Sequence, residues 1–134
     1  MEVAKESLIE VDAKSGIEMT SQQLLNAILE GIARKKGLNV VTIDLDKINH
    51  SECACFVICH GNSTTHVDAI AHSVEDTVSE LAGETAWHKD GYKNSRWVLL
   101  DYADVMVHVF HHEARSFYDL ENLWADAPLA RINI

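Results

Sequence analysis

The segment 53–59 is the feature of the sequence that most constrains the fold. Its residues are apolar at both sets of alternating positions, because cysteines and Val57 alternate with Phe56 and Ile58. Alternate residues of a strand point to opposite faces of a sheet, so both faces of this segment need a cover. We therefore predict a buried, central strand here, in a layered domain that also contains helices.

Two longer stretches and one shorter stretch show the 3.6-residue spacing of amphipathic helices. The first helix is expected to begin at Thr20, which forms a capping-box pattern with Gln23, and to end before Gly37. The second is expected to follow the break at Gly61-Asn62-Ser63 and to end before Gly83, and the third to end at Pro128. The apolar positions are Leu24, Leu25, Ile28, Leu29 and Ile32, then Val67, Ile70, Ala71, Val74, Val78 and Leu81, then Phe117, Leu120, Leu123 and Trp124.

Further strands are predicted from β-branched and aromatic residues. They are 38–45, a short strand at 85–88, and two strands at 96–100 and 105–110 joined closely enough to form a hairpin. This order predicts a single α/β domain with a mixed β-sheet flanked by helices. We expect a flexible N-terminal arm over residues 1–19, the folded domain over 20–127 and a C-terminal tail over 128–134.

The composition limits the classes of partner. A chain of 134 residues, 47% of them hydrophobic, is the size of one domain with one core, and no run of apolar residues is long enough to span a membrane. We therefore expect a cytoplasmic protein. The formal charge is −10, with 21 acidic residues against 11 Lys and Arg, which disfavours direct readout of nucleic acid and favours a basic protein partner.

Two clusters contain residue types that bind metals. The cysteines Cys53, Cys55 and Cys59 are expected to share one face of a buried strand, whereas structural zinc sites use pairs of ligands at turns. The histidines His108, His111 and His112 lie at the end of another predicted strand, where a histidine is more often a hydrogen-bonded core or interface residue. We expect no metal and no cofactor from these patterns.

The patterns for catalysis are weak. Cys59 and Ser63 lie near histidines in the sequence, but no nucleophile-elbow pattern surrounds them. Gly61-Asn62-Ser63 precedes a helix and could bind phosphate, but a turn with a helix cap at Ser63 or Thr64 accounts for it without any ligand and is the favoured interpretation. We expect no catalytic residues; the alternative is a nucleotide-binding or nucleotidyltransferase-like enzyme that uses this turn and a carboxylate pair, Asp101 and Asp104.

Aromatic and aliphatic residues are dense towards the C-terminal end. A hairpin that is apolar on both faces leaves two interpretations open from the pattern alone: all of these residues form core, or one face of the hairpin stays exposed and binds a partner. A dimerisation surface is a third interpretation. The residues are Trp97, Val98, Leu99, Leu100, Tyr102, Val105, Val107, Val109, Phe110, Phe117, Tyr118 and Trp124.

Three segments carry a family resemblance: Cys55 to Ala71, Trp97 to Phe110 and Arg115 to Trp124. In this order they resemble the ribosomal silencing factor (Iojap) family, and the resemblance extends over about Gln22 to Ala127. It implies an α/β domain related in fold to nucleotidyltransferases but without their activity. It also implies binding to ribosomal protein fourteen of the large ribosomal subunit, at the subunit interface, which blocks joining of the small subunit and slows translation when nutrients are short.

The resemblance also implies which residues contact that partner, and it places Trp97 and Tyr102 on the side of the hairpin that faces the ribosome. The full set is Trp97, Val98, Leu99, Asp101 and Tyr102, with Asp104, Val107 and His108 nearby. Two residues depart from the family pattern: Ala103 replaces a usual glycine, and His60 replaces a usual small residue. If the turn needs a positive φ at Ala103, alanine costs about 1 kcal/mol there.

Overall fold

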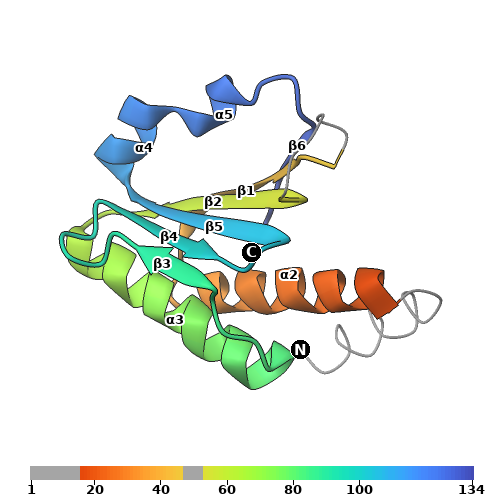
Figure 1. Ribbon diagram of the computed structural model, residues 1–134. Coiled ribbons are helices and arrows are strands. Elements are labelled where there is room, and N and C mark those ends of the chain that lie inside the picture. The colour runs from red at the N-terminus through yellow and green to blue at the C-terminus, as the bar shows by residue number, and fades with distance from the viewer. Residues whose placement is uncertain (1–15, 47–52) are drawn as a thin grey trace.

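The computed structural model describes residues 16–46 and 53–134, which form a six-stranded mixed sheet with helices on both faces (Figure 1). The strand order is β3-β4-β5-β2-β1-β6; β2 and β5 are parallel, and every other neighbouring pair is antiparallel. The elements in chain order are α2 (Gly16–Arg34), β1 (Leu38–Asp44), β2 (Cys55–Gly61), α3 (Thr64–Ala82), β3 (His88–Asp90), β4 (Trp97–Asp101), β5 (Val105–His111), α4 (His112–Tyr118), α5 (Leu120–Leu123) and β6 (Leu129–Arg131). The predicted fold class is confirmed.

Helices α2 and α3 cover one face of the sheet (Figure 1). They pack against each other closely at Gly31, where a Cβ atom would lie 2.7 Å from the Cα of Val74. Ser73 reinforces this contact, because its buried hydroxyl donates a 2.8 Å hydrogen bond to the carbonyl of Gly31. The larger core cluster lies between these helices and the sheet, and it contains Val57 and Cys59 of the central strand β2.

Helices α4 and α5 lie on the opposite side of the sheet (Figure 1). A second, smaller core cluster forms beneath them and contains Phe56 and Ile58 of β2 together with Phe110. Strand β2 is therefore covered on both faces and lies inside the sheet, as its sequence predicted.

Most predicted elements are confirmed, but four differ from the structure. Helix α2 begins at Gly16 and not at Thr20, so the helix extends into the predicted N-terminal arm. The short strand is β3 at His88–Asp90 and not 85–88. The third predicted helix is two helices, because Asp119 adopts a left-handed φ of 51° between α4 and α5. The predicted tail contains β6, which pairs antiparallel with β1.

None of the helices in the described ranges combines the length and the hydrophobicity that crossing a membrane requires. Residues 1–15, most of the predicted arm, lie outside the described part of the chain.

Candidate binding face on the hairpin of β4 and β5

The hairpin of β4 and β5 has two faces of different character. Val98 pairs with Val109 and Leu100 with Val107, and all four point into the core beneath α2 and α3. The alternate residues of β4 point to the side of α4 and α5, where Trp97, Leu99 and Asp101 are each half-buried. Half of the hairpin is therefore core, while the other face retains accessible surface.

This alternation divides the predicted contact residues. Trp97, Leu99 and Asp101 lie on the accessible face, and Asp104 is exposed in the turn. In contrast, the side chains of Val98 and Val107 are fully buried in the core. A period of two along a strand forces this division, so the adjacent contacts that the family pattern implies cannot all share one surface.

Tyr102 is 3% exposed and belongs to the core cluster beneath α2 and α3. The expectation that its side chain lies on an exposed, ribosome-facing surface is therefore wrong. The reason is that Tyr102 follows the last β4 residue and continues the inward set of Val98 and Leu100. Its hydroxyl has no hydrogen-bond partner among the described residues, and burial raises its pKa well above that of an exposed tyrosine.

An aromatic cluster supports the accessible face from below. The ring of Trp97 lies 4.9 Å from that of Phe110 and 4.8 Å from that of Tyr118, which is 49% exposed on α4. The indole nitrogen of Trp97 donates a 3.1 Å hydrogen bond to Nδ1 of His108. These contacts fix the orientation of Trp97, the largest side chain on the face.

His108 is buried beneath this face, at 4% exposure. Burial lowers its pKa to about 4, so the imidazole is neutral near pH 7. Since Nδ1 accepts the bond from Trp97, the proton lies on Nε2, and this atom has no hydrogen-bond partner among the described residues. His108 thus supports Trp97 and is not itself an accessible contact.

A surface groove of about 300 Å³ continues the accessible face towards the turn, and sequence reasoning missed two of its residues. Trp87 is 82% exposed, and its backbone N–H donates a 2.8 Å bond to the carbonyl of Asp101. Met106 lies opposite Asp101 on β5 and is half-buried. The alternation of Met106 with Val105 and Val107 could have placed it on this face, but no local signal in the sequence brings Trp87 there.

The turn between the two strands has a constrained backbone. Ala103 adopts a φ of 71°, so the condition under which alanine is costly at this position is met. Around it the N–H of Asp104 donates to the carbonyl of Tyr102, and a carboxylate oxygen of Asp101 accepts a 2.8 Å bond from the N–H of Ala103. Asp101 thereby helps to hold the turn in addition to lining the groove.

The two aspartates of this turn point apart. Asp101 lines the groove beside Trp87, whereas Asp104 lines a different pocket and accepts a 3.1 Å bond from the hydroxyl of Ser21 on α2. Among the described residues, neither belongs to a group of three potential metal ligands whose donor atoms lie within 4.8 Å of one another. The pair therefore lacks the convergent carboxylates that a nucleotidyl-transfer site needs.

The glycine turn after β2 is occupied by bonds within the chain. Ser63 caps α3 by accepting a 3.0 Å bond from the N–H of His66, and Nδ1 of His66 accepts a 3.2 Å bond from the N–H of Asn62. Two amides that a phosphate would need already have partners. The interpretation as a turn and helix cap is confirmed.

The structure places the three cysteines on two faces of the sheet. Cys55 and Cys59 point to the side of α2 and α3, but Cys53 precedes β2 and packs with the cluster on the other face, so the expectation that all three share one face is wrong. Burial raises the pKa of both Cys55 and Cys59 to about 12, so they are thiols near pH 7.

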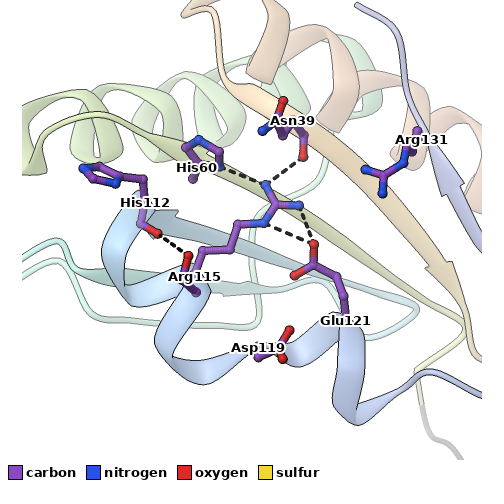
Figure 2. Close-up of a pocket in the computed structure, with 8 residues that line it drawn as sticks. Asn39, His60, His112, Arg115, Asp119, Glu121 and Arg131 are labelled. Carbon is purple, nitrogen blue, oxygen red and sulfur yellow. Dashed lines mark hydrogen bonds and ion pairs between the residues drawn. The ribbon is translucent and has the colours of Figure 1, made fainter.

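A polar pocket of about 330 Å³ lies at the other end of the sheet, between α4, α5 and the start of β1 (Figure 2). Figure 2 shows the guanidinium of Arg115 between Glu121 on one side and Asn39 and His60 on the other. Arg115 donates a 2.8 Å bond to Glu121 and a 2.7 Å bond to the carbonyl of Asn39. The 2.8 Å ion pair with Glu121 is mostly buried on the arginine side.

His60, the second departure from the family pattern, lies beside this arginine. Its Nδ1 accepts a 3.0 Å bond from Arg115, which can only donate. Burial, and then the charge of Arg115, lower the pKa of His60. Because Asn39 has a positive φ of 47° at an irregularity of β1, the Arg115 cluster holds together a strained strand end, a short helix and β2.

The chain is similar to known proteins in both sequence and structure. The family model described as "Ribosomal silencing factor during starvation" matches residues 18–134. A ribosomal silencing factor of Halalkalibacterium halodurans is 40% identical over 85% of this chain and 96% of its own length, and one of Bacillus subtilis is 38% identical over 86% and 96%. The crystal structure of a protein from Chromobacterium violaceum superimposes with a TM-score of 0.73 at 32% identity, covering 78% of this chain and 85% of that one.

Proposed function

The chain belongs to the ribosomal silencing factor family, and from this premise we propose that it binds the large ribosomal subunit and blocks joining of the small subunit. Translation is thereby repressed when nutrients are limited. The partner on the subunit is ribosomal protein fourteen, a basic protein at the subunit interface. The protein acts in the cytoplasm, where the subunits meet.

The observation that carries the proposal is the accessible face of the β4–β5 hairpin. Trp97, Leu99 and Asp101 retain exposed surface on a strand whose other face is core, and Trp87 is almost fully exposed beside them. Large aromatic side chains with polar and charged groups around them are typical of a binding surface, which has an apolar centre and a polar rim. We assign the direct contacts to Trp97, Leu99 and Asp101, with Met106 and Trp87 added and Asp104 at the rim.

The buried members of the predicted set have a different role in this proposal. Val98, Tyr102 and Val107 pack beneath the face, and His108 fixes the indole of Trp97. They determine the shape of the surface without contacting the partner. Substituting them is expected to reduce binding in proportion to the loss of folded protein.

Charge supports a basic partner. The chain has a formal charge of −10, and Asp101 and Asp104 lie at the end of the hairpin. An acidic surface accelerates association with a basic protein and makes binding weaken as salt rises. It also repels ribosomal RNA, so the contact is expected to be with protein and without readout of bases.

The enzyme alternative has less support. The relatives reported above are named as silencing factors, the carboxylates of Asp101 and Asp104 point apart, and the amides around Ser63 are engaged within the chain. A homodimer through the accessible face is the other alternative. It would compete with subunit binding, since the two would use the same residues.

Direct binding to purified large subunits tests the proposal. Leu99→Asp places a charge in the centre of the face and is expected to weaken binding at least about thirtyfold, the equivalent of about 2 kcal/mol. The matched control is Leu129→Asp, because Leu129 is an exposed leucine on β6, at the opposite edge of the sheet. Asp101→Lys is expected to slow association and to reduce the salt dependence.

The melting curve of each variant is recorded alongside the binding data. Equal binding by the parent and by folded Leu99→Asp would show that this face does not carry the interaction. A mass in solution that falls from dimer to monomer in Leu99→Asp would favour the homodimer alternative.

A further inference from the structure

Three side chains with metal-binding groups converge where β5 ends and α4 begins. His111 is the last residue of β5, and His112 and Glu113 begin α4. Each offers one potential ligand atom, and these three atoms lie within 4.8 Å of one another. The two imidazole rings are 4.5 Å apart between centroids, and Nδ1 of His111 is 3.8 Å from a carboxylate oxygen of Glu113.

The distances are close to those of a coordinated ion. Zinc binds imidazole nitrogen at about 2.0–2.1 Å and carboxylate oxygen at about 2.0–2.2 Å, so two ligand atoms on one ion lie roughly 3–4 Å apart. Small rotations bring the three atoms to that separation, and two of the side chains are free to make them, since His112 and Glu113 are exposed on the first turn of α4.

The side chain of His111 is held in place at the start of α4. Its side chain is 13% exposed, and its Nδ1 accepts a long 3.3 Å bond from the N–H of Glu113. This bond caps the short helix α4, and at 3.3 Å it is long for a hydrogen bond, so the same nitrogen is available to a metal.

The location agrees with where α/β folds bind ligands. β2 and β5 are the parallel pair of this sheet, and His111 lies opposite Gly61 at their common carboxyl end. Ligands of open α/β sheets bind beyond the carboxyl ends of parallel strands. The turn at Ala103 precedes the first residue of β5, so it lies at the opposite end of this strand.

We propose that His111, His112 and Glu113 form a binding site for a divalent transition metal of the zinc class, with water completing the coordination. Two imidazoles and one carboxylate are a ligand set that zinc accepts, whereas magnesium and calcium prefer oxygen ligands. From the sequence, His111 and His112 were grouped with His108 and no metal was expected; in the structure His108 is buried beneath the hairpin face and is not a member of this group. The start of α4 supplies Glu113.

A metal here would connect β5 to the first turn of α4. The last residue of that short helix, Tyr118, contacts Trp97 of the accessible hairpin face. Occupancy is therefore expected to stiffen the helix that supports Trp97, which gives a readout in thermal stability independent of ribosome binding.

Titration calorimetry with zinc chloride tests the site, using the full chain without a histidine tag and stripped of metal by chelator. One zinc per chain with micromolar affinity is expected. His112→Ala and Glu113→Gln should each weaken binding at least about tenfold, since even the loss of a residue that only supports a ligand costs that much. His88→Ala is the matched control, because His88 is an exposed histidine on β3.

Two further readouts decide where the metal binds. Imidazole nitrogen resonances of His111 and His112 should shift on adding zinc while those of His88 do not. The cobalt complex should lack a thiolate charge-transfer band, because no cysteine belongs to the proposed ligand group. Unchanged binding in both variants, the absence of binding at micromolar zinc, or a thiolate band that disappears in Cys55→Ser would each overturn the proposal.

Discussion

The backbone conformation of Ala103 lowers the stability of the folded protein. Its φ of 71° lies in the left-handed region, where a Cβ atom is strained by about 1 kcal/mol or more. Ala103→Gly should therefore raise the free energy of unfolding by roughly 0.5–1 kcal/mol, after the greater flexibility of glycine in the unfolded chain is subtracted.

Urea denaturation measures this difference, with Ala130→Gly on β6 as the matched control. Ala130 is exposed and is not among the positive-φ residues of the described chain, so glycine there should lower stability by a similar amount. Ala103→Gly is thus expected to raise the free energy of unfolding and Ala130→Gly to lower it. A loss of stability in Ala103→Gly would mean that the turn is not strained as described.

His108 links stability to pH. Its pKa is about 4 in the folded protein, and the ordinary value of 6.5 applies when the chain unfolds. Below about pH 6.5 His108 is protonated in the unfolded chain but stays neutral in the folded protein. The free energy of unfolding therefore falls as the pH decreases from about 6.5 to about 4. Between pH 7 and pH 5 the loss from this residue should be on the order of 2 kcal/mol.

Urea midpoints at these two pH values, compared between the parent and His108→Asn, isolate the effect. Asparagine does not titrate and keeps an acceptor for the indole of Trp97. The variant should lose less stability than the parent on acidification, although His60 contributes in the same direction in both. An equal loss in parent and variant would contradict the buried, neutral state of His108.

At the scale of elements, Arg115 joins segments that are far apart in the sequence. It connects α4 to Glu121 on α5, to the carbonyl of Asn39 on β1 and to His60 on β2. Arg115→Met would leave the carboxylate of Glu121 and two carbonyls without their donor, which should cost about 3 kcal/mol or more.

Arg34→Met is the control for Arg115→Met, and chemical denaturation is the measurement. Arg34 also forms ion pairs, with Glu30 and Glu80, but these are at the surface, where such pairs are worth at most about 1 kcal/mol. Comparable losses in the two variants would show that the Arg115 cluster does not hold the elements together.

The elements that sequence patterns predicted well are the long ones with a clear period. The apolar stripe and the glycine C-cap set the end of α3 at Ala82, and two apolar faces set β2 inside the sheet. Apart from the start of α2, the strands missed or misplaced are short: β3 and β6 have three residues each, too few for a period, and both are defined by pairing with another strand. The break between α4 and α5 depends on the backbone of Asp119, which no apolar spacing reveals.

The candidate binding face was predictable only in part for a similar reason. Family resemblance indicated this hairpin, and alternation along β4 separates the half-buried Leu99 from the buried Val98. Tyr102 was misplaced because its position was taken from the resemblance, whereas the alternation of Val98 and Leu100 continues one residue past the end of β4 and directs its side chain into the core. Trp87 joins the face only through the pairing of β3 with β4 and the bond to Asp101.

At the scale of the whole molecule, the two faces of the sheet differ in how far helices cover them. Helices α2 and α3 bury the residues of β2, β4 and β5 that face them, and the shorter α4 and α5 leave part of the other face accessible beside β4. Subunit joining followed by light scattering tests this division most directly. The parent and Leu129→Asp should inhibit joining of the two subunits equally, whereas folded Leu99→Asp should require at least about thirtyfold more protein. Full inhibition by folded Leu99→Asp at the concentration of the parent would contradict the account.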